Sequence, residues 1–295
     1  MKGINFGRKL IQKITKATPR GVVVKTGYQD INAWSLFEDG TTDAGFVVKG
    51  FLGPSTCKEI KDKVEALDKS DFNTIQEGFY TLPASVAHKS DRKFDDPQTV
   101  SASDFEKSNQ FRKTFPSKFG VDLEEQLTKS LQEIFRTKKV GVPMAGAEQD
   151  PLTPFSIRVM EPNAEIYLHC GNYVQMRHQD FYDRFSKNVE VYNQLSYFLI
   201  IEEPEVDGEL TVFNANWSDY SNRDGEERLI SKKDKTVDPY SLGATKVAPA
   251  IGDLFIFAGG KYWHRVEKVL GQKNRITIGG FIGKSKKADE IFIWS

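Results

Sequence analysis

The second half of the chain shows a regular pattern of short apolar runs separated by turn residues. Beyond about residue 150, Gly, Pro, Asn and Asp divide runs that are rich in β-branched and aromatic side chains: SIRVM, EIYLH, LSYFLII, GELTVFN, DLFIFAGG, RITIGGFIG and EIFIW. Many short strands with this punctuation are typical of an all-β barrel or sandwich. We therefore predict a β core over residues 151–295.

The first 150 residues mix helix and strand signals. Phe46-Val47-Val48 predicts a strand, and two later stretches, PSTCKEIKDKVEALDKS from Pro54 and VDLEEQLTKSLQEIFRTK from Val121, carry apolar residues at helical spacing. The segment between them, FNTIQEGFYTLPASVAHKSDRKFDD, predicts a long irregular loop of the kind that often borders an active site. Helices followed by strands indicate helices packed against the β core. We expect one domain over residues 1–295, with a helix-rich part over 1–150.

One charged stretch, SDYSNRDGEERLISKKDKTVD, interrupts the β-rich half between two predicted strands. Its composition predicts a solvated surface loop. A lid over a site is the alternative.

Composition excludes several classes of function. The chain has 295 residues with 41 basic and 41 acidic side chains, so it has no net charge and no indication of a nucleic-acid partner. No apolar run reaches the roughly 18 residues that span a bilayer, so no membrane association is expected. The two cysteines, Cys57 and Cys170, supply neither a disulfide framework nor a zinc motif. A reducing cytoplasm is the expected location.

Two of the four histidines follow strand-like runs. His169 comes after EIYL, and His264 comes after DLFIFAGGKYW. Two strand ends of a small barrel can bring such residues together, and imidazole is a suitable ligand for Fe(II). Two histidines and one carboxylate form the facial triad of non-haem iron oxygenases. Here Gly171 stands where many such enzymes have the acid.

A possible co-substrate anchor follows the second histidine. Arg275 and Thr277 are two residues apart on a predicted strand, so their side chains share one face. An arginine is the natural bidentate partner of a carboxylate. This pair could hold the distal carboxylate of 2-oxoglutarate.

Other interpretations of these residues stay open from the pattern alone. A single histidine at a strand end is often only hydrogen-bonded, and a glycine after a strand is often only a turn residue. His178-Gln179-Asp180 is a literal His-x-Asp, which would make the protein an ordinary hydroxylase, although MRHQDFYDRFSK does not end an apolar strand. A jelly-roll without catalytic activity is a third interpretation, which an intact His169 and His264 disfavour.

The joint pattern resembles a known family. The stretches TPFSIR, EIYLHCGNY, QLSYF, GELTVFNANW, GDLFIFAGGKYWHRV and RITIGGF are similar to the iron(II)/2-oxoglutarate-dependent oxygenases, and within them to the freestanding halogenases of hapalindole-type indole alkaloid biosynthesis. The resemblance runs from about Thr153 to Trp294. It implies a mainly β fold with packed α-helices and a double-stranded β-helix (jelly-roll, cupin-like) core.

The resemblance also implies roles for individual residues. His169 and His264 would bind Fe(II), and Gly171 would vacate a coordination position that chloride or bromide fills. O₂ and 2-oxoglutarate would be consumed, a hydrogen atom would be removed from an unactivated aliphatic carbon, and the substrate radical would take the halide. Ser196 aligns with a serine that favours this outcome over hydroxylation.

Arg158 shares a strand face with Ser156 and Met160 by alternation, and as a buried arginine it needs an anion. The halide, 2-oxoglutarate or a structural acid would each serve.

The substrate implied by the resemblance is a small natural-product molecule, with an indole alkaloid as one candidate. The residues considered for its pocket are Phe79, Tyr80, Leu82, Val86, Val174 and Trp217. Several of the six are as well explained as core residues. A hydroxylase of a small molecule is the alternative function.

Overall fold

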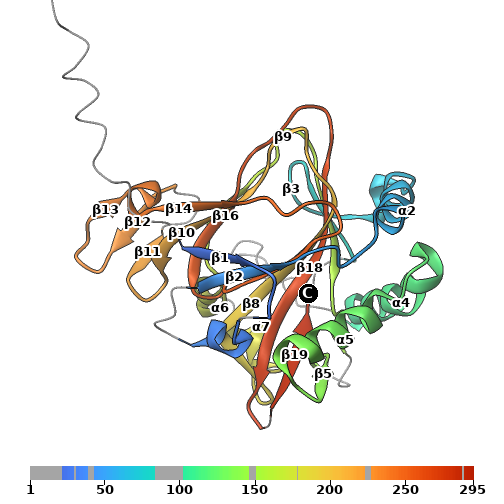
Figure 1. Ribbon diagram of the computed structural model, residues 1–295, viewed down its shortest axis with the longest axis horizontal. Coiled ribbons are helices and arrows are strands. Elements are labelled where there is room, and N and C mark those ends of the chain that lie inside the picture. The colour runs from blue at the N-terminus through green and yellow to red at the C-terminus, as the bar shows by residue number, and fades with distance from the viewer. Residues whose placement is uncertain are drawn as a thin grey trace, which may run out of the picture.

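Strands from both halves of the chain form one large sheet in the computed structural model, which describes residues 22–29, 31–38, 43–83, 102–145, 151–177, 179–222, 227–287 and 289–295 (Figure 1). The strand order is β1-β2-β15-β8-β18-β6-β4-β3, and β19 pairs with β18 and with β5. Their bounds are β1 Val23–Thr26, β2 Asp43–Val48, β3 Asn73–Gln76, β4 Phe79–Leu82, β5 Lys139–Gly141, β6 Ser156–Met160, β8 Val189–Glu202, β15 Leu254–Phe257, β18 Arg275–Ser285 and β19 Glu290–Trp294.

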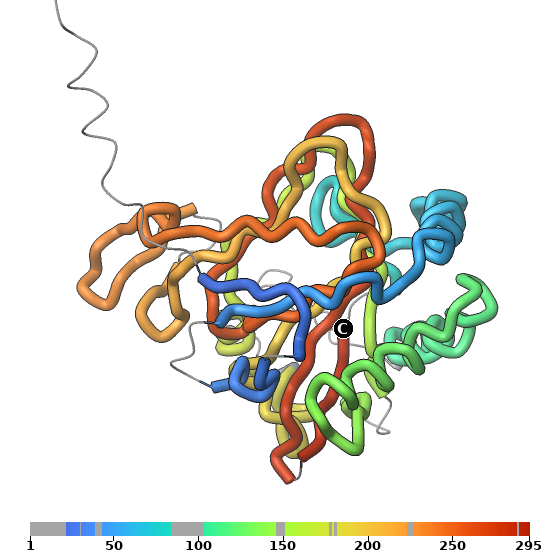
Figure 2. Tube along the Cα trace, in the orientation of Figure 1, coloured from blue at the N-terminus to red at the C-terminus, as the bar shows by residue number. Residues whose placement is uncertain are grey.

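A second, smaller sheet faces the main sheet. It has the order β14-β10-β16-β7, with β7 Ile166–His169, β10 Leu210–Asn216, β14 Ala244–Val247 and β16 Tyr262–Val266. The trace in Figure 2 shows the chain passing back and forth between the two sheets. This two-sheet arrangement is the predicted jelly-roll core with helices outside it.

The central strands are apolar on both faces because both are covered. All four residues of β15 are buried, and β15 lies between β2 and β8. Such a strand appears in the sequence as a continuous apolar run rather than an alternating one. Together with neighbouring strands and helices, it contributes to the main hydrophobic core.

Three helices lie together at one side of the main sheet (Figure 1). They are α2 Pro54–Glu65, α4 Ala102–Phe119 and α5 Leu123–Phe135. Helix α5 begins at the N-cap Asp122, whose side chain accepts a 3.0 Å hydrogen bond from the backbone N–H of Glu125. Its buried face is the predicted apolar face, with Leu123, Leu127, Leu131, Ile134 and Phe135.

Several local predictions need correction. The segment predicted as irregular contains β3 and β4, and residues 84–101 lie outside the described ones. The charged stretch predicted as a loop contains a three-stranded sheet of β11 Tyr220–Asn222, β12 Leu229–Ser231 and β13 Thr236–Val237. His264 does not follow the end of one long strand, because the chain turns after β15 and His264 lies in the middle of β16.

The remaining elements connect these layers. They are η1 Ala33–Phe37, η2 Lys69–Asp71, η3 Pro239–Leu242, α6 Gly171–Arg177, α7 Gln179–Asp183, β9 Val206–Asp207 and β17 Val269–Leu270. Among the described residues, none of the helices combines the length and apolar character needed to cross a membrane.

Candidate active site

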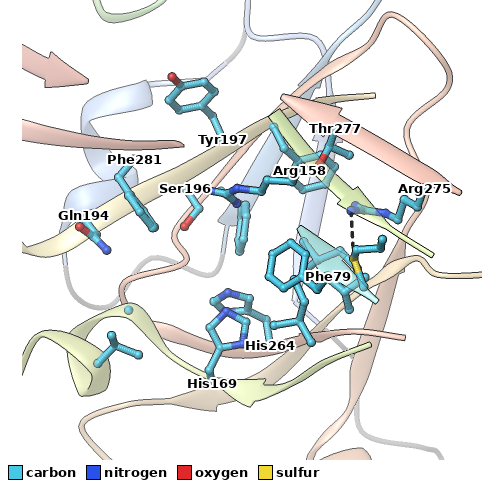
Figure 3. A pocket seen from close by; sticks show the side chains of 18 of the residues that line it. Phe79, Arg158, His169, Gln194, Ser196, Tyr197, His264, Arg275, Thr277 and Phe281 are labelled. Carbon is cyan, nitrogen blue, oxygen red and sulfur yellow. Dashed lines mark hydrogen bonds between the residues drawn. The ribbon is translucent and has the colours of Figure 1, made fainter. Parts of the chain in front are cut away.

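Two histidine rings lie side by side between the sheets. In the antiparallel pairing of β16 with β7, His264 lies directly opposite His169. The ring centroids are 4.1 Å apart and the ring planes are inclined by 56° (Figure 3). Strand pairing therefore brings together the two histidines that the sequence singled out.

Backbone carbonyls fix the tautomers of both rings. Nδ1 of His169 is 2.8 Å from the carbonyl oxygen of Tyr167, and Nδ1 of His264 is 2.8 Å from that of Tyr262. A carbonyl only accepts, so Nδ1 carries the proton and Nε2 carries the lone pair in each neutral ring. Burial holds the pKa of His264 well below its usual value, and the neighbouring His169 contributes to the same shift. A neutral imidazole with an oriented Nε2 is the form that binds a metal ion.

Gly171 lies two residues after His169, at the start of α6. The N–H groups of Gly171 and Asn172 donate 2.9 Å hydrogen bonds to the carbonyls of Gly259 and Gly260. A Cβ at position 171 would lie 3.1 Å from Gly260 Cα and 3.0 Å from Gln194 Nε2. Among the described residues, no group of three or more His, Cys, Asp and Glu side chains could hold a metal ion. The histidine pair thus has no acidic third member in that part of the chain.

Two arginines enter the same space from the main sheet. Across β6 and β18, Arg158 lies opposite Thr277 and Arg275 lies opposite Met160. The only described hydrogen bond of the Arg275 side chain is a 3.9 Å contact from Nη1 to the sulfur of Met160. Arg158 Nε and Nη2 are buried and have no hydrogen-bond partner. Within the described chain, neither guanidinium forms an ion pair with a carboxylate.

Both arginines keep their charge despite burial. Desolvation lowers the pKa of Arg158 to about 10, and desolvation together with the Arg158 charge lowers the pKa of Arg275 to about 10. Both are therefore protonated near pH 7. A buried charge is costly unless an anion or a set of hydrogen bonds compensates it. The hydroxyl of Thr81, opposite Arg158 on β4, is also buried without a partner.

A cavity of about 140 Å³ lies between the histidine pair and the two arginines. Every predicted site residue lines it: His169, Gly171, His264, Ser196, Arg158, Arg275 and Thr277. The rest of the lining is mostly apolar and includes Met160, Ile166, Phe198, Phe257, Val266 and Phe281. In Figure 3 the histidine pair lies on one side of the cavity, with the arginines across from it.

The proposed pocket residues divide into different groups. Phe79 and Val174 line the cavity. Leu82 packs against the main core, and the Tyr80 hydroxyl donates a 3.1 Å hydrogen bond to Glu161. Trp217 stacks on Tyr192 with ring centroids 6.2 Å apart. Val86 lies outside the described residues, as do His178 and the side chain of Asp180.

Sequence reasoning missed Gln194. It lines the cavity, is 1% exposed, and lies on β8 two residues before Ser196. Strand alternation from Ser196 within QLSYF would have placed it on the same face. Phe281, opposite Ser196 on β18, was missed in the same way.

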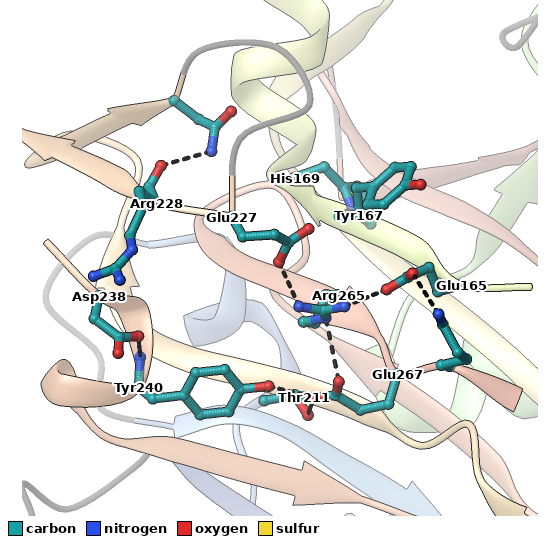
Figure 4. A network of polar contacts seen from close by, with 12 residues as sticks. Glu165, Tyr167, His169, Thr211, Glu227, Arg228, Asp238, Tyr240, Arg265 and Glu267 are labelled. Atoms are coloured by element: carbon teal, nitrogen blue, oxygen red, sulfur yellow. Dashed lines mark hydrogen bonds and ion pairs between the residues drawn. The ribbon is translucent and has the colours of Figure 1, made fainter. Parts of the chain in front are cut away.

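An ionic cluster lies on the outer face of the histidine strands (Figure 4). Arg265, next to His264, pairs with Glu165 and Glu227 and lies 3.2 Å from Glu267. Glu165 directly precedes β7, and Glu227 belongs to the charged stretch that contains β11, β12 and β13. The Arg265 guanidinium therefore connects both histidine strands and this charged stretch.

Comparison with known proteins identifies the family. The family model of the carrier-protein-independent halogenase WelO5 matches residues 37–295. Among solved structures, an N-substituted L-amino acid dioxygenase from Burkholderia ambifaria AMMD superposes with a TM-score of 0.53, at 14% identity over 89% of each chain. The same enzyme in complex with alpha-KG gives 0.53 at 13% identity, again over 89% of each chain. These identities establish a shared fold only. No curated protein sequence matches.

The fold and family model define an iron(II)/2-oxoglutarate-dependent oxidoreductase. Because the match covers most of the chain, the protein belongs to the carrier-protein-independent halogenase family. It is a halogenase that acts on a small molecule and uses iron, 2-oxoglutarate, O₂ and a halide.

The ionic cluster generates a first prediction. Arg265→Leu removes the cation and leaves three carboxylates facing one another, so the free energy of unfolding should fall by about 1–3 kcal/mol. Lys246→Leu is the matched control, because Lys246 also bridges two acids, at 3.7 and 3.6 Å, but its side chain is 52% exposed. It should cost under about 1 kcal/mol. Urea unfolding of both variants makes the measurement, and equal losses would contradict the role given to Arg265.

Proposed function

We propose that His169 and His264 hold iron(II), and that Gly171 leaves the adjoining space open for chloride or bromide. The observation that carries this proposal is the pair of adjacent imidazoles, each with Nδ1 2.8 Å from a backbone carbonyl, which has no acidic third member of a metal-binding group among the described residues. Their Nδ1 atoms are committed to backbone carbonyls, so Nε2 supplies the lone pair. Two nitrogen donors of this kind suit iron(II).

Iron(II) held there, with 2-oxoglutarate, O₂ and halide, would supply the oxidising power for replacing the hydrogen of an aliphatic C–H bond by the halide. The residues of this chain bind and orient the reactants. The apolar wall of Phe198, Phe257 and Phe281 keeps water from the reacting carbon.

Arg275 and Thr277 are proposed to bind the distal carboxylate of 2-oxoglutarate. A guanidinium with no carboxylate partner in the described chain, beside a hydroxyl on the same strand face, matches a carboxylate in charge and geometry. Arg158 is proposed to take a second anionic group, from the same co-substrate or the halide. Its buried Nε and Nη2 then gain the partners that they lack.

The Ser196 hydroxyl is proposed to bias the outcome toward halide transfer. It lines the cavity with the histidines and lies opposite Phe281 on the neighbouring strand. A hydrogen-bond donor at this place would favour transfer of the halide over hydroxylation at the substrate carbon.

The proposed substrate is an apolar natural-product intermediate with an unactivated aliphatic carbon, and an indole alkaloid is the class that we favour. Aromatic side chains contribute much of the cavity wall, and such faces suit a fused-ring molecule. A cytoplasmic location is proposed because Cys57 and Cys170 are both free thiols in the interior.

The metal ligands are tested by removing one imidazole at a time. His169→Ala and His264→Ala should each lose iron and 2-oxoglutarate turnover, because one remaining histidine is a weak site. His178→Ala is the control and should keep both. Iron content and succinate formation make the measurement. If His169→Ala retains turnover while His178→Ala loses it, the assignment is wrong.

The co-substrate anchor is tested by binding. Losing one partner of a buried charged hydrogen bond costs about 2–5 kcal/mol, so Arg275→Ala should raise the 2-oxoglutarate Kd by roughly tenfold or more. Lys273→Ala removes a nearby cation whose side chain is 57% exposed, and it should leave the Kd within about twofold. Anaerobic titration with iron present gives both constants. An unchanged Kd in Arg275→Ala would remove Arg275 from the site.

The role of Gly171 is tested by filling the space. Gly171→Asp places a carboxylate where the halide is proposed to bind, so product should shift from halogenated to hydroxylated, or 2-oxoglutarate consumption should uncouple from product. Gly171→Ala is the steric control, since its Cβ meets the same close contacts at 3.0–3.2 Å without adding charge. Mass spectrometry of product separates the two variants. Halogenation by Gly171→Asp at the level of Gly171→Ala would contradict this role.

A further inference from the structure

We propose that Gln194 is a halide-binding residue whose side-chain amide N–H donates a hydrogen bond to the chloride or bromide in front of Gly171. This inference rests on the halide position proposed above. Gln194 would give the halide position a hydrogen-bond donor from the protein, in addition to the space left by the missing side chain of Gly171.

The position of the amide is the first support. Gln194 Nε2 lies 3.0 Å from the point that a Cβ at residue 171 would occupy. An acidic side chain at 171 would start at that point, so Nε2 borders the space that the glycine leaves open. Gln194 lines the same cavity as both histidines, and 1% of its surface is exposed.

The burial of the amide is the second support. Oε1 of Gln194 is buried and has no hydrogen-bond partner. Nε2 belongs to the same side chain, of a residue that is 1% exposed, and an acceptor that pairs with this interior N–H donor gains affinity. An anion accepts from N–H and is repelled by a carbonyl oxygen. The orientation with nitrogen toward Gly171 is the one that an anion favours.

The backbone holds Gln194 and Gly171 in fixed relation. The N–H of Gly260 donates a 2.8 Å hydrogen bond to the Gln194 carbonyl, and the N–H of Gly171 donates to the Gly259 carbonyl. Both residues are thus bound to Gly259 and Gly260 in the turn between β15 and β16. In Figure 3, Gln194 and Arg275 lie on opposite sides of the histidine pair, so the amide is separate from the proposed carboxylate anchor.

A second buried glutamine provides the matched control. Gln175 on α6 is 2% exposed, and neither its Oε1 nor its Nε2 has a hydrogen-bond partner, but it does not line the cavity. An unpaired amide alone therefore does not define a site. The proximity to Gly171 distinguishes Gln194.

Anaerobic halide titration tests the proposal. Enzyme loaded with Fe(II) and 2-oxoglutarate is titrated with sodium chloride or bromide at constant ionic strength, and the change in the iron/2-oxoglutarate charge-transfer band gives a halide Kd. Gln194→Leu should raise this Kd roughly tenfold or more, the effect of one hydrogen bond to a charged group. Gln194→Glu, of nearly the same shape, should weaken halide further because it adds an anion. Gln175→Leu should stay within about twofold of wild type.

Each outcome supports or overturns a stated claim. A Gln194→Leu enzyme with the wild-type halide Kd overturns the role of Gln194, as does a parallel loss of 2-oxoglutarate affinity, which indicates general disruption. If Gln194→Leu does not fold, Gln194→Glu decides the question by the same titration. If wild type itself gives no halide response, the proposed halide position fails, and that result is distinct from a failure confined to Gln194.

Discussion

The antiparallel pairing of β7 with β16 is the constraint on which the site depends. It places His169 opposite His264, although the two strands are far apart along the chain. Adjacent residues of a strand point to opposite faces, so a slip of one residue would turn a histidine out of the cavity. Arg265 joins the carboxylates of both strands on the outer face, where it opposes such a slip. The imidazoles on the inner face can then be oriented by short contacts to their own strands.

Charge is the second organising feature of the cavity. Arg158 and Arg275 bring two positive charges into an interior where, among the described residues, no carboxylate pairs with them, and the first lowers the pKa of the second. This arrangement is unfavourable until anions enter. Ligands that bind only the folded chain stabilise it, so co-substrate and halide should contribute to stability as well as to chemistry. A dicarboxylate is the natural complement of such a cavity.

Much of this fold could be predicted, because strand periodicity and helix starts are local signals. Alternation placed Arg158 on one strand face with Met160, and both residues line the cavity. Helix α4 was missed because its apolar residues are interspersed with polar ones and Pro116 lies within it. The turn before β16 was also missed. Apolar residues lie on both sides of the two glycines in DLFIFAGGKYWH, so the segment looks like one continuous strand. Gln194 shares a strand face with Ser196 by alternation, but its residue type did not single it out, because a glutamine on a strand has many ordinary uses.

The residues around the proposed halide position all pack against the turn that contains Gly259 and Gly260. A Cβ at Gly259 would lie 2.3 Å from the Ser196 hydroxyl, and a Cβ at Gly260 would lie 2.5 Å from the Gln194 carbonyl. Both glycines are therefore required for close packing, and the same turn accepts the first hydrogen bonds of α6 at Gly171. A side chain at 171 must displace this turn by a few tenths of an ångström. The open position at Gly171 is thus shaped by three segments that pack together: the start of α6, strand β8 and the turn after β15. A substitution at Gly171 must move these neighbours.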